Sequence, residues 1–275
     1  MDKYKEKLRN ILSKPQTRRF ILIALFIIAA TIFLVSVFML YDDSDYRKAQ
    51  DEYNRLREYS PSTLSVRPTP DPLTPSTTPD TSPDSSPEPS PDPIDTLPQI
   101  DERTQKLLDI NPDYIGWIEI EGTVIDYPVV QGENNGQYIH TTFEGEDNIA
   151  GTIFMDWKND SSFMSSFSVL YGHNSRDGGM FADLHNYSDE EFLDEFPIIT
   201  ITTPMGEALN YRIFKARLAL VTDKLFTLFG KDQKTVNEYF IEHGAPEKAE
   251  NFIVLSTCTD SWNDDERLLI FAAME

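Results

Sequence analysis

Cysteine is almost absent from this chain of 275 residues, in which Cys258 is the only one. A single thiol excludes an internal disulfide framework, so the fold must be stabilised by a hydrophobic core rather than by cross-links. The thiol itself has two interpretations at this point. It is either a buried cysteine that packs as a small apolar residue, or an accessible and reactive one.

Basic side chains are also scarce, because 24 Lys and Arg oppose 46 Asp and Glu and leave a net charge of -22. Seven of those 24 basic residues lie within residues 1–19, so the rest of the chain is strongly acidic. Such a surface repels the phosphates of nucleic acids and of anionic lipids. We therefore expect no nucleic acid among the partners.

Charge is missing altogether from Phe20 to Tyr41, a run of 22 residues. At about 1.5 Å per residue, a helix of this length crosses a hydrocarbon core of roughly 30 Å. A cleaved signal peptide is the alternative, but its apolar region is shorter and ends in a small-residue site that VFMLYDDSD does not offer. We predict a membrane helix over 20–41, with residues 1–19 as a basic cytoplasmic tail and the rest outside the cell.

Aromatic residues are absent from residues 61–98, which hold 12 of the 18 prolines among Ser, Thr and Asp. Such a segment cannot bury enough apolar surface to fold, and we predict a disordered stalk. Residues 42–60 before it are polar and compatible with a helix. Their apolar side chains follow a 3, 4, 3 spacing that indicates either a solvated extension of the membrane helix, which we favour, or a short dimerisation seam; they are Tyr46, Ala49, Tyr53 and Leu56.

Globular composition begins at about residue 99, and we predict that residues 99–275 form the catalytic domain. A helix is expected in DERTQKLLDINPD, with Leu107, Leu108 and Ile110 on its apolar face and Pro112 ending it. Eight strand-like runs follow, with one long helix over residues 231–244 between the sixth and the seventh. The fold class is therefore mainly β, an eight-stranded closed or nearly closed barrel. The runs are YIGWIEI, TVIDYPVV, GTIFMDW, FSVLYG, FPIITITT, EALNYRIFKARLALV, NFIVLST and RLLIFAAM.

Cys258 ends one of these runs, and Arg267 begins the next, nine residues later. A hairpin would return the guanidinium to the rim that carries the sulfur, where a cation lowers the thiol pKa and can hold an oxyanion. Of the four histidines, His173 in a glycine-rich loop is the best placed as acid and base. His140 and His185, flanked by apolar residues, are predicted to pack, and His243 to lie at a helix C-terminus. Polar residues at strand ends are common, so spacing alone does not establish Cys258, His173 and Arg267 as catalytic residues.

Three separated motifs, GTIFMDW, YGHNSRDGGMF and VLSTC followed by Arg267, resemble in this order the signature of class B sortases. The resemblance covers residues 105–275. It implies a cysteine transpeptidase in which Cys258 is the nucleophile, His173 the acid and base, and Arg267 the transition-state stabiliser, with no cofactor and no metal. The implied partners are secreted proteins that carry a C-terminal sorting signal, cleaved after Thr, and an amine of the peptidoglycan cross-bridge or of a pilin lysine.

The resemblance also implies that the peptide groove is lined by Asn135, Ile139, Tyr171, Ser256 and Thr257. For Ile139 and Tyr171, plain core packing is an equal alternative. Asp260 is a candidate for orienting His173, against a solvated acidic loop as the simpler explanation. Two other functions stay open, a surface cysteine peptidase that transfers the acyl group to water and a non-enzymatic β-barrel binding module on a stalk.

Overall fold

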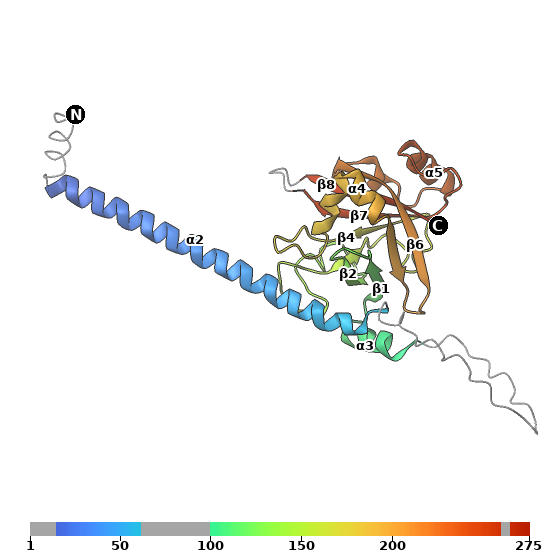
Figure 1. The fold of residues 1–275 in the computed structure, drawn as a ribbon, viewed down its shortest axis with the longest axis horizontal. Helices are drawn as coiled ribbons and strands as arrows, with labels where there is room; N and C mark the ends of the chain where they lie inside the picture. The colour runs from blue at the N-terminus through green and yellow to red at the C-terminus, as the bar shows by residue number, and fades with distance from the viewer. Residues whose placement is uncertain (1–14, 62–99, 260–264) are drawn as a thin grey trace, which may run out of the picture.

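The structure is a computed structural model that describes residues 15–61, 100–259 and 265–275. Helix α2, Pro15–Leu56, forms one long rod that runs up to the globular part of the chain (Figure 1). Its stretch Arg18–Val37 has a mean hydropathy of 3.0 and none of it is buried, so it is long and apolar enough to cross a membrane. By composition and length, α2 is the only described helix of this kind.

The last three turns of α2 pack against the globular part, and the short helix η1, Arg57–Tyr59, continues them. Ala49, Tyr53 and Leu56 are each at most 2% exposed and belong to the main hydrophobic core. The expected solvated extension is therefore wrong, because the apolar seam buries its side chains against the barrel. The folded unit begins before residue 99, at about Asp45.

Apart from Pro61, the expected stalk lies outside the described residues. The residues on either side of it lie together, since Nη1 of Arg103 donates to the carbonyl oxygen of Ser60 at 3.5 Å. Ser60 and Arg103, on the two sides of the segment, thus lie in contact on the folded unit. Helix α2 has already reached the barrel before that segment begins.

Eight strands form a closed barrel in the order β1-β2-β3-β4-β7-β8-β6-β5, as expected. Neighbouring strands are antiparallel except for the β2–β3 and β4–β7 pairs, which are parallel. The strands are β1 Tyr114–Glu119, β2 Asp126–Val130, β3 Ile153–Met155, β4 Phe167–Tyr171, β5 Ile198–Thr202, β6 Ala208–Leu220, β7 Phe252–Cys258 and β8 Glu266–Met274. Six fall within the predicted runs, while β7 extends one residue beyond its run, to Cys258, and β8 begins one residue before its run, at Glu266.

Short helices cover the barrel ends and one wall. Helix α3, Glu102–Ile110, begins at Asp101, whose side chain accepts from the amide of Thr104. Its Leu107 is buried as predicted, whereas Ile110 is 40% exposed. Helix α5, Gln233–Glu242, confirms the helix expected between the sixth and seventh strands. The stretches η3 Ala182–Ser188, α4 Glu190–Glu195 and η4 Lys224–Thr227 were not predicted.

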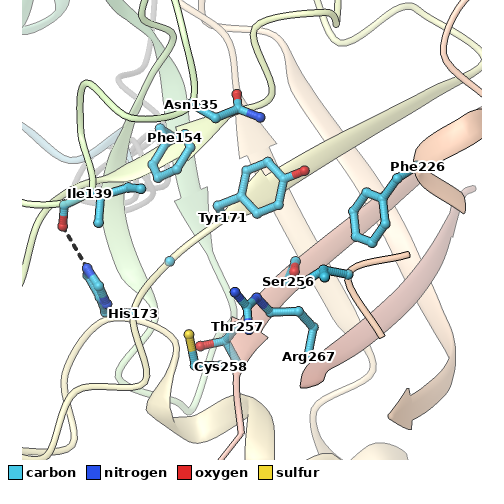
Figure 2. A pocket seen from close by; sticks show the side chains of 12 residues that line it. Asn135, Ile139, Phe154, Tyr171, His173, Phe226, Ser256, Thr257, Cys258 and Arg267 are labelled. Carbon is cyan, nitrogen blue, oxygen red and sulfur yellow. Dashed lines mark hydrogen bonds between the residues drawn. The ribbon is translucent and has the colours of Figure 1, made fainter. Parts of the chain in front are cut away.

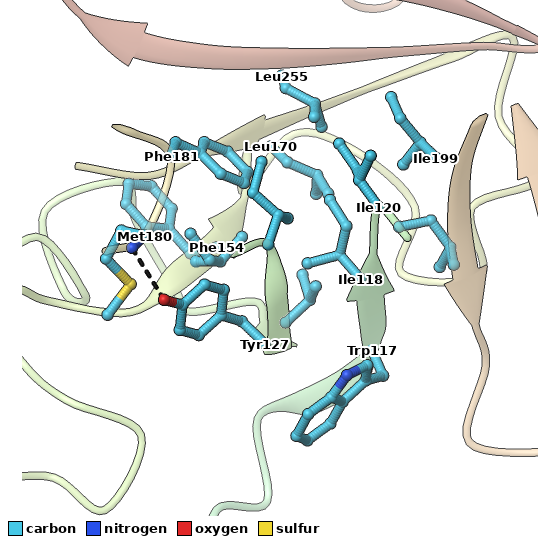
Figure 3. Close-up of a cluster of buried hydrophobic side chains, with 14 of the residues drawn as sticks. Trp117, Ile118, Ile120, Tyr127, Phe154, Leu170, Met180, Phe181, Ile199 and Leu255 are labelled. Carbon is cyan, nitrogen blue, oxygen red and sulfur yellow. Dashed lines mark hydrogen bonds between the residues drawn. The ribbon is translucent and has the colours of Figure 1, made fainter. Parts of the chain in front are cut away.

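Two apolar clusters hold these parts together. One fills the barrel interior with side chains such as Ile118, Tyr127 and Leu255 and extends to α2 (Figure 3). The other lies outside the wall formed by β4, β7 and β8 and is covered by η4 and α5. Strand β7 is buried on both faces for this reason, and only its last residue, Cys258, is exposed.

Candidate active site

Cys258 and Arg267 lie directly opposite each other where the β7–β8 ladder ends. Side chains at paired positions of an antiparallel ladder share one face, with Cβ atoms about 5 Å apart. The register therefore confirms that the hairpin returns the arginine to the rim that carries the thiol. Figure 2 shows the guanidinium of Arg267 beside Cys258 and Thr257.

The parallel pairing of β4 with β7 brings His173 to the same edge. Tyr171 pairs with Ser256, and the amide of Gly172 donates to the carbonyl of Ser256 at 3.2 Å. His173 follows Tyr171 by two residues, just as Cys258 follows Ser256, so the two side chains leave the sheet at one level. Gly172 has no room for a side chain, since a Cβ there would lie 2.5 Å from Ile153 and 2.6 Å from Phe181.

One hydrogen bond orients the His173 ring. Its Nε2 lies 2.6 Å from the carbonyl oxygen of Ile139, and because a carbonyl only accepts, Nε2 carries the proton. Nδ1 is then the atom that can take up or release a proton toward the pocket. Figure 2 shows the ring between Ile139 and Cys258.

The surroundings of His173 lower its pKa below 6.5. Burial of the ring is the largest cause, and the neighbouring His140 adds to it, while the Ile139 carbonyl opposes the shift. The two imidazole rings are stacked, with centroids 5.7 Å apart and planes at 17°. His173 is therefore held largely neutral near pH 7 and is able to act as a base.

A pocket of about 350 Å³ opens beside these three residues and is lined by eight of the nine predicted site residues, all except Asp260 (Figure 2). Ile139 is exposed rather than buried, so the core-packing alternative is wrong for it. Tyr171 is half-buried and combines core packing with a place in the pocket wall. Its ring packs on that of Phe154, with centroids 5.2 Å apart, and also lines the pocket. Sequence reasoning missed four lining residues, Phe154, Gly172, Val221 and Phe226.

Behind the pocket wall, the buried carboxylate of Asp156 ties two groove residues together. Its Oδ2 accepts from the hydroxyl of Tyr171 and from Nδ2 of Asn135, both at 2.9 Å. Oδ1 accepts from the amide of Lys158 at 3.0 Å. Burial and the nearby Asp156 carboxylate raise the pKa of Tyr171, which keeps its hydroxyl protonated as a donor. Sequence reasoning missed Asp156, although an acid that follows an apolar strand was visible in GTIFMDW.

The remaining histidines depart in part from expectation. His140 is exposed and stacks on His173, and the half-buried His185 places Nε2 3.0 Å from the carbonyl oxygen of Cys258, so neither is a packing histidine. His243 lies at the C-terminus of α5, as predicted. Asp260 lies outside the described residues. Within residues 15–61, 100–259 and 265–275, no group of three His, Cys, Asp or Glu is arranged to hold a metal ion.

Comparison with known proteins agrees with this geometry. A sequence profile described as the sortase domain matches residues 118–275, more than half of the chain. The chain belongs to the sortase family. Sortase B of Listeria monocytogenes is 32% identical over 152 residues, which are 55% of this chain and 55% of that protein. Sortase B of Staphylococcus aureus is 29% identical over 180 residues, 62% of this chain and 72% of that protein.

The fold is shared as well. A Staphylococcus aureus sortase B–substrate complex superposes with a TM-score of 0.65 at 21% identity, covering 84% of this sortase and 98% of that chain. At this identity the likeness establishes the fold alone. The sortase described here spans about half the length of its Listeria relative.

Proposed function

We propose that this sortase is a membrane-anchored, extracytoplasmic cysteine transpeptidase. It cleaves a C-terminal sorting signal after Thr and joins the new carboxyl end to an amine of the cell wall or of a pilin. The observation that carries the proposal is the meeting of Cys258, His173 and Arg267, from β7, the β4 loop and β8, at one edge of a pocket. A nucleophile, a proton carrier and a fixed cation are what acyl transfer requires.

In the first half-reaction, Nδ1 of His173 takes the proton of the Cys258 thiol, and the sulfur attacks the carbonyl carbon of the Thr. Arg267 stabilises the oxyanion that forms, because its charge lies where negative charge develops. The peptide C–N bond then breaks, and His173 gives the proton on Nδ1 to the leaving amine. A thioester remains on Cys258.

In the second half-reaction, an amine attacks the thioester carbon and Nδ1 of His173 removes its proton. The C–S bond breaks, the departing thiolate takes the proton from Nδ1 to restore the thiol, and a new amide bond is complete. The proton stays on Nε2 throughout, donated to the carbonyl oxygen of Ile139, so the ring exchanges protons on its pocket side only. Chain residues supply every proton and charge that these steps use.

The pocket suits a peptide in chemistry as well as in size. Ser256 and Thr257 line its wall next to the thiol. Phe154 and Phe226 add apolar surface for side chains of the signal. The Staphylococcus aureus relative was solved as a substrate complex, which supports the same use here.

The anchor follows from α2. No part of its apolar stretch is buried against the rest of the protein. An exposed apolar surface of this length suits contact with lipid rather than with water. Basic residues precede the stretch and acidic ones follow it, so we assign the N-terminus to the cytoplasm and the barrel to the outside of a Gram-positive cell.

The test uses the full chain in detergent, because α2 is part of the folded unit. It is incubated with fluorogenic peptides that vary around a central Thr, with and without oligoglycine or diaminopimelate, and Cys258→Ala runs alongside. A peptide–amine adduct by mass spectrometry that the alanine variant does not form is the expected result. Hydrolysed product alone, in the presence of amine, would establish a peptidase instead, and an unreactive thiol would leave a binding module.

A further inference from the structure

The docked end of α2 makes several polar contacts with the loop of residues 131–152 between β2 and β3. The hydroxyl of Tyr53 donates to the carbonyl of Gly151 at 2.6 Å, and Oγ1 of Thr152 lies 3.2 Å from the same hydroxyl. Glu52 accepts from the amide of Glu144 at 2.9 Å. The loop contains no helix or strand of its own, so its shape depends on such contacts.

Gly151 and Thr152 in turn lie against the part of the loop that reaches the active site. Gly151 has φ of +58°, and a Cβ on it would lie 2.4 Å from the carbonyl oxygen of Ile139. The amide of Thr152 donates to Tyr138 at 3.1 Å, and its hydroxyl to Thr141 at 2.7 Å. The backbone around Ile139 is therefore set directly by the pair that Tyr53 holds.

The carbonyl of Ile139 is the acceptor that orients His173. A second route reaches the other flank of the same histidine. The ring of Tyr53 meets that of Tyr127 edge to face at 5.3 Å, and the Tyr127 hydroxyl accepts from the amide of Met180 at 3.0 Å (Figure 3). The next residue, Phe181, donates its amide to the carbonyl of His173 at 2.9 Å.

We infer that Tyr53 is a positioning residue for His173, through which the docked end of the anchor helix α2 sets the geometry of the acid and base. Tyr53 touches neither the pocket nor the reacting atoms. Its effect passes through Gly151 and the Ile139 carbonyl on one side, and through Tyr127 and Met180 on the other. The inference rests on the proposed function for its consequence in catalysis, while the geometry of His173 can be measured without it.

The test compares Tyr53→Phe and Thr152→Val with Tyr211→Phe in the full chain in detergent. Tyr211 is a matched control, because it is also a buried tyrosine whose hydroxyl donates to a backbone carbonyl, that of Phe163 at 3.3 Å, but it does not contact loop 131–152. Thermal unfolding shows whether the variants are folded and lose similar stability. The readouts are kcat and KM for the sorting peptide, and the NMR titration of His173, one of only four histidines.

For Tyr53→Phe and Thr152→Val we expect kcat to fall about tenfold with KM within about twofold, since small displacements of a catalytic group cost large factors in rate. The titration midpoint of His173 should fall, because a weaker bond to Ile139 removes the contact that favours the charged ring. Tyr211→Phe should change neither. If both variants match Tyr211→Phe in rate and in titration, α2 only stabilises the fold and the inference is wrong. If the wild type performs no transpeptidation, the proposed function fails, and the titration of His173 alone then tests whether Tyr53 positions this histidine.

Discussion

The Tyr171 hydroxyl donates to Oδ2 of Asp156 at 2.9 Å, and the same oxygen accepts from Asn135. One buried carboxylate thus fixes two walls of the pocket that come from different parts of the chain. Asp156 is 2% exposed, so its carboxylate is out of contact with bulk water. Its loss would affect both the fold and the shape of the groove.

We predict that Asp156→Ala lowers the free energy of unfolding by about 1–3 kcal/mol, the usual cost of leaving buried donors without an acceptor. The KM for the sorting peptide should rise, because Tyr171 and Asn135 lose their common anchor. Urea denaturation and steady-state kinetics measure the two effects. Asp160→Ala is the control, an exposed acid on the same loop that should change little. Equal behaviour of the two variants would contradict the role given to Asp156.

Arg267→Gln should lower kcat about 10²- to 10³-fold, the loss seen when an oxyanion donor is removed from an acyl-transfer site. The variant keeps a side chain of similar length but not the charge that faces Cys258 across the ladder. Arg212→Gln serves as the control. Arg212 lies on β6, forms an exposed ion pair with Glu275 and does not line the pocket. A normal kcat in Arg267→Gln would remove the arginine from the mechanism.

Stability should depend on pH through His173, whose pKa burial lowers below 6.5. Between the folded pKa and 6.5 the unfolded chain binds more protons than the folded one, so the free energy of unfolding rises with pH in that window. This contribution is complete above about pH 6.5 and is lost as the pH falls. Denaturation at several pH values should show a smaller rise in His173→Gln than in the wild type or in Tyr211→Phe. An unchanged rise would refute the burial effect.

The single thiol reports the orientation of the anchor. Cys258 is exposed, and the chain has no other cysteine to compete with it. We predict that a membrane-impermeant thiol reagent labels the full chain on intact cells, and that Cys258→Ala takes up no label. Labelling that appears only after the cells are permeabilised would place the barrel in the cytoplasm and overturn the proposed localisation.

Local pattern was enough to predict the strands and the helix between β6 and β7. Alternation and apolar runs determine which residues a strand can bury, so all eight strands match their predicted runs to within one residue at the ends that face each other in β7 and β8. The hairpin of Cys258 and Arg267 was predictable for a similar reason, since the two strands are adjacent in sequence.

Contacts between distant segments could not be predicted in this way. The spacing of Ala49, Tyr53 and Leu56 marked an apolar seam, but a seam does not identify its partner, and the barrel covers it instead of water or a second copy. His140 and His185 have apolar neighbours in sequence, yet their rings meet His173 and the Cys258 carbonyl. Asp156 gained its role only when Tyr171 and Asn135 came within hydrogen-bonding distance of it.

The sequence by itself determined the apolar span, the barrel strands and the one thiol, because these follow from composition and from periodicity along a continuous stretch. Only the tertiary structure decided that the end of α2 is part of the folded unit and that Nε2 of His173 donates its hydrogen bond to the carbonyl of Ile139. The parallel β4–β7 pairing that brings His173 level with Cys258 joins strands more than 80 residues apart. Such a register is set by the packing of the whole barrel, and no local pattern encodes it.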